Sequence, residues 1–313
     1  MRGFANLGEP AHRCERAAKR NNLPSIQDGN SAREIRPRVK LVMTLLVRDA
    51  DDLISSNLDF HLRSGVDHFI IMNNLSTDRT ESLLELYRRR GLVTYLYQPE
   101  DTFSQDRWVT QMARSAYDIG ADWVINNDAD EFWYADGLDL KRALSGVSPE
   151  HHAVAADRKH FVPRGLTRGT FFADEMTVRY ARLLSPSGKP WPGKVCHRAR
   201  PDIEVGYGNH SASVGGRELP AVEAGIEILH FPMRSYEKFE GVVVNGGKAS
   251  ERNPDQPAKR WQELYRLWQE GVLRAYFDAQ APDPDEVQAG LRDGRYVRDE
   301  RIKAALRSLR TIA

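Results

Sequence analysis

DWVINNDADEFW, at residues 122–133, joins a short apolar strand directly to a cluster of carboxylates. The run 123–125 is typical of a buried strand, and Asp128, Asp130 and Glu131 follow it closely. In an extended chain Asp128 and Asp130 project to the same face, so they can share one cation. Oxygen ligands suit Mg²⁺ or Mn²⁺ better than Zn²⁺, and a site with few protein ligands leaves room for substrate phosphates. The stretch therefore predicts a site for a metal-bound diphosphate.

An isolated Asp-x-Asp is more often an exposed turn than a ligand site. Here an apolar strand precedes the carboxylates and the aromatic residues 132–134 follow them, which favours a partly buried position.

Apolar runs and helical spacings alternate from residue 39 to residue 125, which predicts an α/β fold with a doubly wound, mostly parallel sheet and ligands at the C-terminal strand ends. Expected strands are 39–47, 69–72, 92–97 and 123–125, and expected helices are 49–63, 78–90 and 104–119.

The pattern changes after about residue 150. Short apolar runs at 153–155, 177–180 and 226–229 lie between Gly- and Pro-rich loops, which predicts an antiparallel extension of the sheet. Two C-terminal helices follow, one starting near Pro254 and one from about Asp283 to Leu309. We expect three parts: a disordered basic tail (1–38), an α/β domain (39–250) and a C-terminal helical segment (251–313).

Charge and composition exclude several classes of protein. The 313 residues carry a net charge of +1, and residues 1–38 hold eight basic and four acidic residues, a net +4 that leaves −3 for the rest. A faintly acidic body argues against a nucleic-acid partner. Two cysteines cannot form a disulfide framework, and we expect neither a transmembrane helix nor a signal peptide. A cytoplasmic protein is expected, with the basic tail able to contact an anionic membrane surface at its inner face.

A second polar cluster follows the second expected strand, at residues 73–78. Asn, Ser and Asp side chains there can hydrogen-bond a nucleotide's base and ribose, although the same residues are common in turns and helix caps. The first strand ends in Arg48-Asp49, so three polar clusters converge on one edge of the sheet.

LVMTLLVRD (41–49), FIIMNNLSTDRT (69–80) and DWVINNDADEFW (122–133) together resemble the glycosyltransferases of GT-A fold related to family 2, particularly the bacterial subgroup with a DxDEF sequence. The resemblance covers roughly residues 39–250. It implies transfer of a sugar, such as a hexosyl group, from a nucleotide diphosphate sugar to a glycan, lipid-linked or protein acceptor, with inversion and with Mn²⁺ or Mg²⁺ as cofactor.

The resemblance also implies roles for single residues. Asp128 would contact ribose or metal-bound water, Asp130 would ligate the cation, and His230 would be a late third ligand, with His210 as runner-up. Arg48-Asp49 departs from the family's usual Asn-Glu pair, which leaves the base contact open. The implied nucleotide-sugar contacts are Thr44, Arg48, Asp49, Asn74, Ser76 and Asp78, and the candidate phosphate contacts are Lys194, His197, Lys238 and Lys248.

An inverting transferase needs a general base to deprotonate the attacking hydroxyl. Asp174 and Glu175 are candidates if they lie on a loop over the acceptor, and Glu204 and His210 are alternatives. Each of these residues is also typical of surface charge or turns. Two other functions stay open: a nucleotidyl- or phosphotransferase, for which the glycine-rich phosphate loops are missing, and a nucleotide-sugar-binding protein without turnover.

Overall fold

Eight strands form one mixed sheet, in the order β3-β2-β1-β4-β8-β6-β12-β5. The computed structural model describes residues 39–102, 104–167, 169–184, 188–253 and 258–310, so the tail expected at 1–38 lies outside the described residues. The first four strands in this order are parallel to one another, β8 runs antiparallel to β4 and β6, and β12 is parallel to β6 and antiparallel to β5. A parallel sheet with an antiparallel extension is thus confirmed.

The strands of this sheet are β1 (Leu41–Val47), β2 (His68–Asn73), β3 (Val93–Tyr97), β4 (Trp123–Asn127), β5 (Glu131–Ala135), β6 (Ala153–His160), β8 (Lys194–Arg198) and β12 (Ala221–His230). Two small sheets add β9 (Ile203–Val205), β10 (Ala212–Val214) and β11 (Arg217–Glu218), and β7 (Val178–Tyr180) with β13 (Tyr296–Arg298). The helices are α1 (Ile54–Arg63), α2 (Thr80–Arg89), α3 (Gln105–Asp118), α4 (Leu140–Ser145), α5 (Phe172–Glu175), α6 (Tyr236–Glu251), α7 (Lys259–Gln269), α8 (Leu273–Asp278), α9 (Pro284–Asp293) and α10 (Arg301–Arg310).

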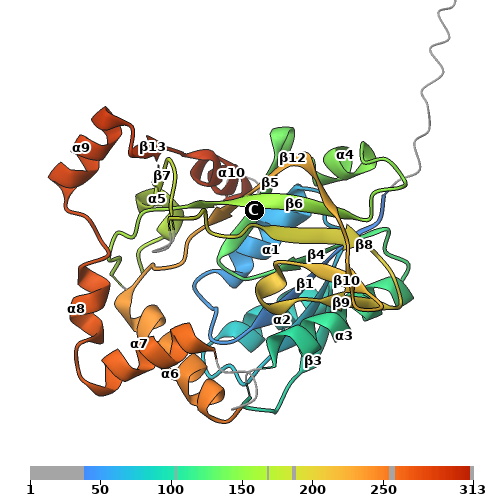
Figure 1. Cartoon of the computed structure of the whole chain (residues 1–313), viewed down its shortest axis with the longest axis horizontal. Helices are drawn as coiled ribbons and strands as arrows, with labels where there is room; N and C mark the ends of the chain where they lie inside the picture. The colour runs from blue at the N-terminus through green and yellow to red at the C-terminus, as the bar shows by residue number, and fades with distance from the viewer. Residues whose placement is uncertain (1–38, 103, 168, 185–187, 254–257, 311–313) are drawn as a thin grey trace, which may run out of the picture. The chain divides into compact units, whose positions relative to one another are not determined.

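The sheet is covered on both faces, as its continuous apolar strands require. Met43 and Leu45 of β1 belong to a buried cluster with α1, α2 and α4, whereas Val42 belongs to a second cluster with α3 and the strands β9 and β10. Successive side chains of one strand therefore enter different layers. Figure 1 shows α3 near β9 and β10 at one side of the sheet.

Aromatic residues fill a third cluster at the β5–β12 end of the sheet. Phe132 packs against Phe172 of α5 and Phe231, with ring centroids 5.6 Å apart in both pairs. Ile302 and Leu306 of α10 complete the cluster. The C-terminal helix is therefore part of the packing that supports the strand ends.

The expected helix from Asp283 to Leu309 is wrong. Gly294, in the left-handed conformation at φ 82°, ends α9, and β13 then pairs with β7 before α10 begins. Left-handed glycine is a common helix terminator, and the strand pairing is a long-range contact that local periodicity does not reveal.

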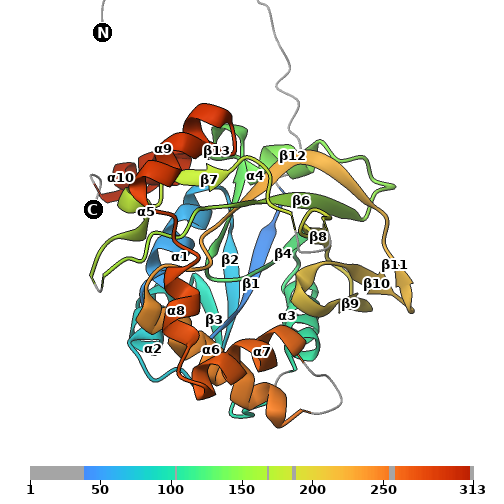
Figure 2. The ribbon, with the colours of Figure 1, turned by 60° about the vertical axis from the view of Figure 1, so that its left-hand side comes forward.

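Helix α6 has no counterpart among the expected elements. It contains Gly241, Gly246 and Gly247, and glycine weakens a local helix signal. Figures 1 and 2 both show α6, α7 and α8 together, and their apolar faces form one buried cluster. The helix expected near Pro254 begins only at Lys259, and residues 254–257 are not among those described. No described helix is long and apolar enough to cross a membrane.

Gly247→Ala is expected to destabilise the protein by about 1–3 kcal/mol, because a Cβ there would lie 2.3 Å from Cβ and Cγ of Tyr265 on α7. Gly241→Ala is the matched control in the same helix, since nothing lies within 4 Å of its Cβ position, and it should gain up to about 1 kcal/mol of helix propensity. Urea unfolding measures both changes, and equal effects of the two substitutions would contradict the close α6–α7 contact.

Candidate functional site

The polar segments expected to converge do lie at one edge of the sheet. β1, β2 and β4 are parallel, so the segments that follow Val47, Asn73 and Asn127 leave the same edge. β6 and β12 end there too: His230 is the register partner of His160 on one side and of Glu131 on the other. The edge therefore combines carboxylates from β4 and β5 with two histidines from the distant half of the chain.

Helix α1 fixes the turn that carries Asp128 and Asp130. Asn57 is fully buried, and its Nδ2 donates to the carbonyl oxygens of Ala129 (3.0 Å) and Glu131 (2.8 Å). His61, one helical turn later, lies 2.9 Å from Oδ1 of Asn57 through Nδ1, while its Nε2 accepts from the backbone N of Trp133. The side chains of α1 thus hold both ends of this carboxylate turn.

Lys194, the first residue of β8, is buried beneath the turn with 1% of its side chain exposed. Its Nζ lies 2.5 Å from Oδ2 of Asp128 and 2.7 Å from Oε2 of the equally buried Glu131. Burial raises the pKa of Glu131, and the Lys194 charge opposes that rise. Burial lowers the pKa of Lys194, but Asp128 and Glu131 outweigh it, so the net shift is upward. One buried cation therefore holds two carboxylates.

Asp130 faces away from this pair toward β12. Its Oδ2 lies 3.5 Å from Nε2 of His230 and 3.9 Å from Arg234. Burial raises the pKa of Asp130, but the neighbouring basic side chains, His230 first and then Arg234 and Lys194, outweigh burial and leave the pKa well below its usual range. Asp130 is thus an anion at neutral pH, with 27% of its side chain exposed.

The donor atoms of Asp130 and His230 fit a shared divalent cation. A carboxylate oxygen and an imidazole nitrogen 3.5 Å apart can ligate the same ion, and these donors suit Mn²⁺. Among the described residues, no group of three His, Cys, Asp or Glu side chains is close enough to hold a metal. Oδ2 of Asp128, the other aspartate of the turn, is held by Lys194.

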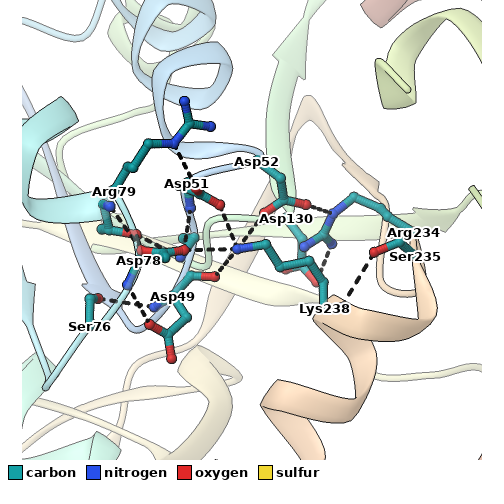
Figure 3. Close-up of polar contacts among 12 residues, drawn as sticks. Asp49, Asp51, Asp52, Ser76, Asp78, Arg79, Asp130, Arg234, Ser235 and Lys238 are labelled. Atoms are coloured by element: carbon teal, nitrogen blue, oxygen red, sulfur yellow. Dashed lines mark hydrogen bonds and ion pairs between the residues drawn. The ribbon is translucent and has the colours of Figure 1, made fainter. Parts of the chain in front are cut away.

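Two basic residues after β12 connect the turn to the loops that follow β1 and β2 (Figure 3). Arg234 donates to Oδ2 of Asp52 at 2.7 Å, besides facing Asp130. Lys238 of α6 donates to Asp51 (2.6 Å) and Asp78 (2.8 Å). Burial raises the pKa of Asp78, but Lys238 and the neighbouring donors hold it well below its usual range. Lys238 is thus already surrounded by carboxylates.

The residues expected to line the nucleotide hold these two loops together. Asp49 adopts a left-handed backbone at φ 51°, its N donates to Oγ of Ser76, and its Oδ1 accepts from the backbone N of Thr77. Asn74 donates to the carbonyl oxygens of Gln98 and Glu100. These hydrogen bonds tie the loop after β1 to the loop after β2, and the loop after β2 to the segment after β3.

Arg48 also lies at this edge, where it forms an ion pair with Asp101 at 2.7 Å. Asp101 in turn contacts Arg252 beyond the end of α6. Lys248, on the same helix, is exposed.

Thr44 and His197 are inside the sheet rather than at its edge. Both are fully buried and both contact Asn126 of β4: Thr44 donates to Oδ1 at 2.8 Å, and Nε2 of His197 lies 3.0 Å from Nδ2. Burial lowers the pKa of His197 to about 4, so it carries no charge at neutral pH. Thr44, the expected nucleotide-sugar contact, and His197, the expected diphosphate contact, are therefore both enclosed within the sheet.

The four base candidates lie in three different places. Asp174, on α5, accepts from Arg307 of α10, and Glu175 beside it is exposed. Glu204 is an exposed residue of β9 that lines an open 890 Å³ cleft along α3. His210 follows the short helix 207–209, whose Asn209 contacts Asp128. Only His210 belongs to a segment in contact with the carboxylate turn.

Several residues of the edge were not singled out from the sequence, namely Asn57, Glu131 as a buried ion-pair partner, His160 and Arg234. Asn57 had a detectable signal, because it shares the apolar face of α1 with Ile54 and Leu58. Glu131 and His160 reach the edge through strand pairing, and Arg234 reaches it from the loop after β12; no local pattern in the sequence indicates these contacts.

Residues 46–156 match the model of glycosyltransferase family 92, which is less than half of the chain. This part of the chain, which includes the carboxylate turn, is similar to the glycosyltransferases of that family. No curated protein matches the sequence.

Solved structures with similar regions include S. aureus TarS 1–349 in complex with UDP (13% identity, 68% of this chain, 65% of that chain, TM-score 0.39). GalNAc-T7 with UDP, GalNAc and Mn²⁺ is similar over 62% of this chain and 44% of that one (11% identity, TM-score 0.38). Mycobacterium tuberculosis glucosyl-3-phosphoglycerate synthase with Mn²⁺, UDP and phosphoglyceric acid is similar over 51% of this chain and 56% of that chain (16% identity, TM-score 0.31). The chain therefore spans less than two thirds of the length of each of these structures.

Lys194→Met is expected to cost about 3–5 kcal/mol of unfolding free energy, because it leaves the Glu131 carboxylate buried with its nearest cation removed. Lys159→Met removes a more exposed pair with Glu227 and should cost less than about 1 kcal/mol. Chemical denaturation compares the two. The double variant Lys194→Met/Glu131→Gln should recover part of the loss, and no recovery would show that the charge of Glu131 is not its cause.

Proposed function

We propose that this protein is a metal-dependent glycosyltransferase that moves a sugar from a nucleotide diphosphate sugar to an acceptor hydroxyl, with inversion. One observation carries the proposal: a turn with two aspartates, inside the stretch that matches a glycosyltransferase model, lies 3.5 Å from a histidine on a distant strand. Ligand sites of open α/β sheets lie at this edge, outside the C-terminal ends of the strands.

Asp130 and His230 would hold the cation, and their spacing supports this role. Bound there, Mn²⁺ or Mg²⁺ would act as a Lewis acid that neutralises the charge developing on the leaving diphosphate. Asp128 would contact the ribose or a water on the ion. Lys194 holds its Oδ2, whereas Oδ1 accepts long contacts from Gln105 and Asn209. Lys194 orients the carboxylates rather than contacting phosphate itself.

The loops after β1 and β2 would bind the base and ribose, through Asp49, Ser76 and Asp78. Their hydrogen bonds to each other support a preformed surface, and a surface ordered in advance loses less entropy when a ligand binds. Lys238 could meet the diphosphate only by giving up one of its carboxylate partners.

His210 is the base candidate with the most suitable chemistry. Its Nδ1 lies 2.6 Å from the carbonyl oxygen of Gly193, so the proton resides on Nδ1 and Nε2 keeps its lone pair. Burial lowers the pKa of His210, which leaves the ring neutral at pH 7. Asp174, in contrast, already accepts from Arg307.

Asp130→Asn should abolish a Mn²⁺-dependent thermal shift with one of UDP, GDP or CDP, because the amide removes the anionic ligand. Asp136→Asn is the matched control, since Asp136 is exposed just beyond the other end of β5. Release of nucleotide diphosphate from the corresponding sugar nucleotide, assayed in parallel, separates the alternatives. Nucleotide binding without release of nucleotide diphosphate would favour a non-catalytic binding protein. Transfer of a nucleotidyl or phosphoryl group would favour a nucleotidyl- or phosphotransferase. No thermal shift with any of the nucleotides would contradict the proposal.

His210→Gln should lower kcat by about 10²–10⁴-fold while leaving the donor's Kd unchanged, as loss of a general base predicts. His151→Gln, at a partly exposed histidine, is the control. In the wild type the rate should fall as the pH drops below the lowered pKa of His210, because protonation removes the base, and it should be flat above pH 7. Unchanged turnover in His210→Gln would place the base elsewhere.

A further inference from the structure

The last residues of β6 and β12 form a histidine pair at the site edge. His160 and His230 are register partners on neighbouring parallel strands, so their side chains project to the same face. The ring centroids are 4.8 Å apart with the planes at 72°, and the two Nδ1 atoms are 2.9 Å apart. This geometry is a hydrogen bond between the rings, and it leaves each Nε2 available for another partner.

The two Nε2 atoms have different surroundings. Nε2 of His230 faces Oδ2 of Asp130 at 3.5 Å, on the side where the proposed cation would lie. Nε2 of His160 is buried and has no hydrogen-bond partner among the described residues. His160 itself is only 8% exposed, so its ring cannot rotate freely to exchange these contacts.

The position of one proton follows from these contacts. A nitrogen that ligates a cation must offer a lone pair, so a metal-binding His230 must carry its proton on Nδ1. Among the residues that the structure describes, the one acceptor for that Nδ1–H is the bare Nδ1 of His160, 2.9 Å away. His160 then carries its own proton on Nε2.

We propose that His160 is a positioning residue: it accepts a hydrogen bond from Nδ1–H of His230 and thereby keeps Nε2 of His230 unprotonated and directed at the cation beside Asp130. The inference rests on the proposed function and adds a residue that does not itself touch the ion. A hydrogen bond of this kind fixes the tautomer and orientation of a ligating histidine, and its loss typically weakens metal binding about 10- to 100-fold.

The test compares two substitutions of nearly equal shape. His160→Leu removes the acceptor, whereas His160→Asn places Oδ1 near the position of Nδ1 and can still accept. Mn²⁺ affinity is measured by EPR of free Mn²⁺ in the presence of UDP, with far-UV circular dichroism and thermal unfolding recorded for each variant. We expect about a 10- to 100-fold weaker Kd for His160→Leu and a Kd within about threefold of the wild type for His160→Asn.

Equal Mn²⁺ affinity of His160→Leu and the wild type would overturn the inference, and so would an equal loss in both variants, which would indicate packing rather than acceptance. Asp130→Ala distinguishes failure of the proposed cation site from failure of the role of His160. If Asp130→Ala leaves Mn²⁺ binding intact, the cation site of the proposed function is wrong. If Asp130→Ala loses Mn²⁺ binding and His160→Leu does not, only the role of His160 is refuted. Should His160→Leu not fold, ¹⁵N NMR of histidine-labelled wild type loaded with Mg²⁺ and UDP decides. In that state the inference requires the proton of His160 on Nε2, and a proton on its Nδ1 refutes it.

Discussion

The rest of the site depends on the ion pairs that the buried ammonium group of Lys194 forms with Asp128 and Glu131. A carboxylate as enclosed as that of Glu131 needs a nearby cation, and Lys194 supplies it while also holding Asp128. The lysine comes from β8, the strand that joins the parallel half of the sheet to the antiparallel half, and the carboxylates flank the turn between β4 and β5. The shape of the turn is therefore a consequence of long-range strand pairing, and this pairing leaves Asp130 free to face His230.

Much of the parallel half of the fold could be predicted from the sequence, because the buried strands β1, β2 and β4 are continuous apolar runs and the helices between them have clear periodicity. The order of β8, β6, β12 and β5 could not be predicted, since pairing between strands distant in the chain, parallel for β6 and β12 and antiparallel for the others, has no local signal. Helix α6 escaped detection because its glycines, which allow α7 to pack closely, also weaken helix propensity. The break between α9 and α10 depended on a strand pairing with β7.

The candidate site shows the same division. The position of Asp128 and Asp130 at this edge could be predicted because they directly follow a strand, and their role as ligands stays a prediction. Thr44 lies before the end of its strand, and its buried side chain donates a hydrogen bond to Asn126, its register partner on β4. His160 could be recognised as a neighbour of the site only from its pairing with His230 on the adjacent strand. Residues that reach the site through a neighbouring strand are thus found only from the structure, whereas residues at the ends of predicted strands can be placed from the sequence.

Arg234 and Lys238 extend this arrangement by linking the carboxylate turn to the loops after β1 and β2, so that the polar groups of the edge form one connected set (Figure 3). The central claim is that this edge holds a cation between Asp130 and His230 together with a nucleoside diphosphate. Anomalous diffraction from crystals grown with Mn²⁺ and UDP tests it most directly. We predict a manganese peak within bonding distance of Asp130 and His230, with the diphosphate next to it. A nucleotide bound elsewhere, or bound at this edge with no manganese at these two residues, would contradict it.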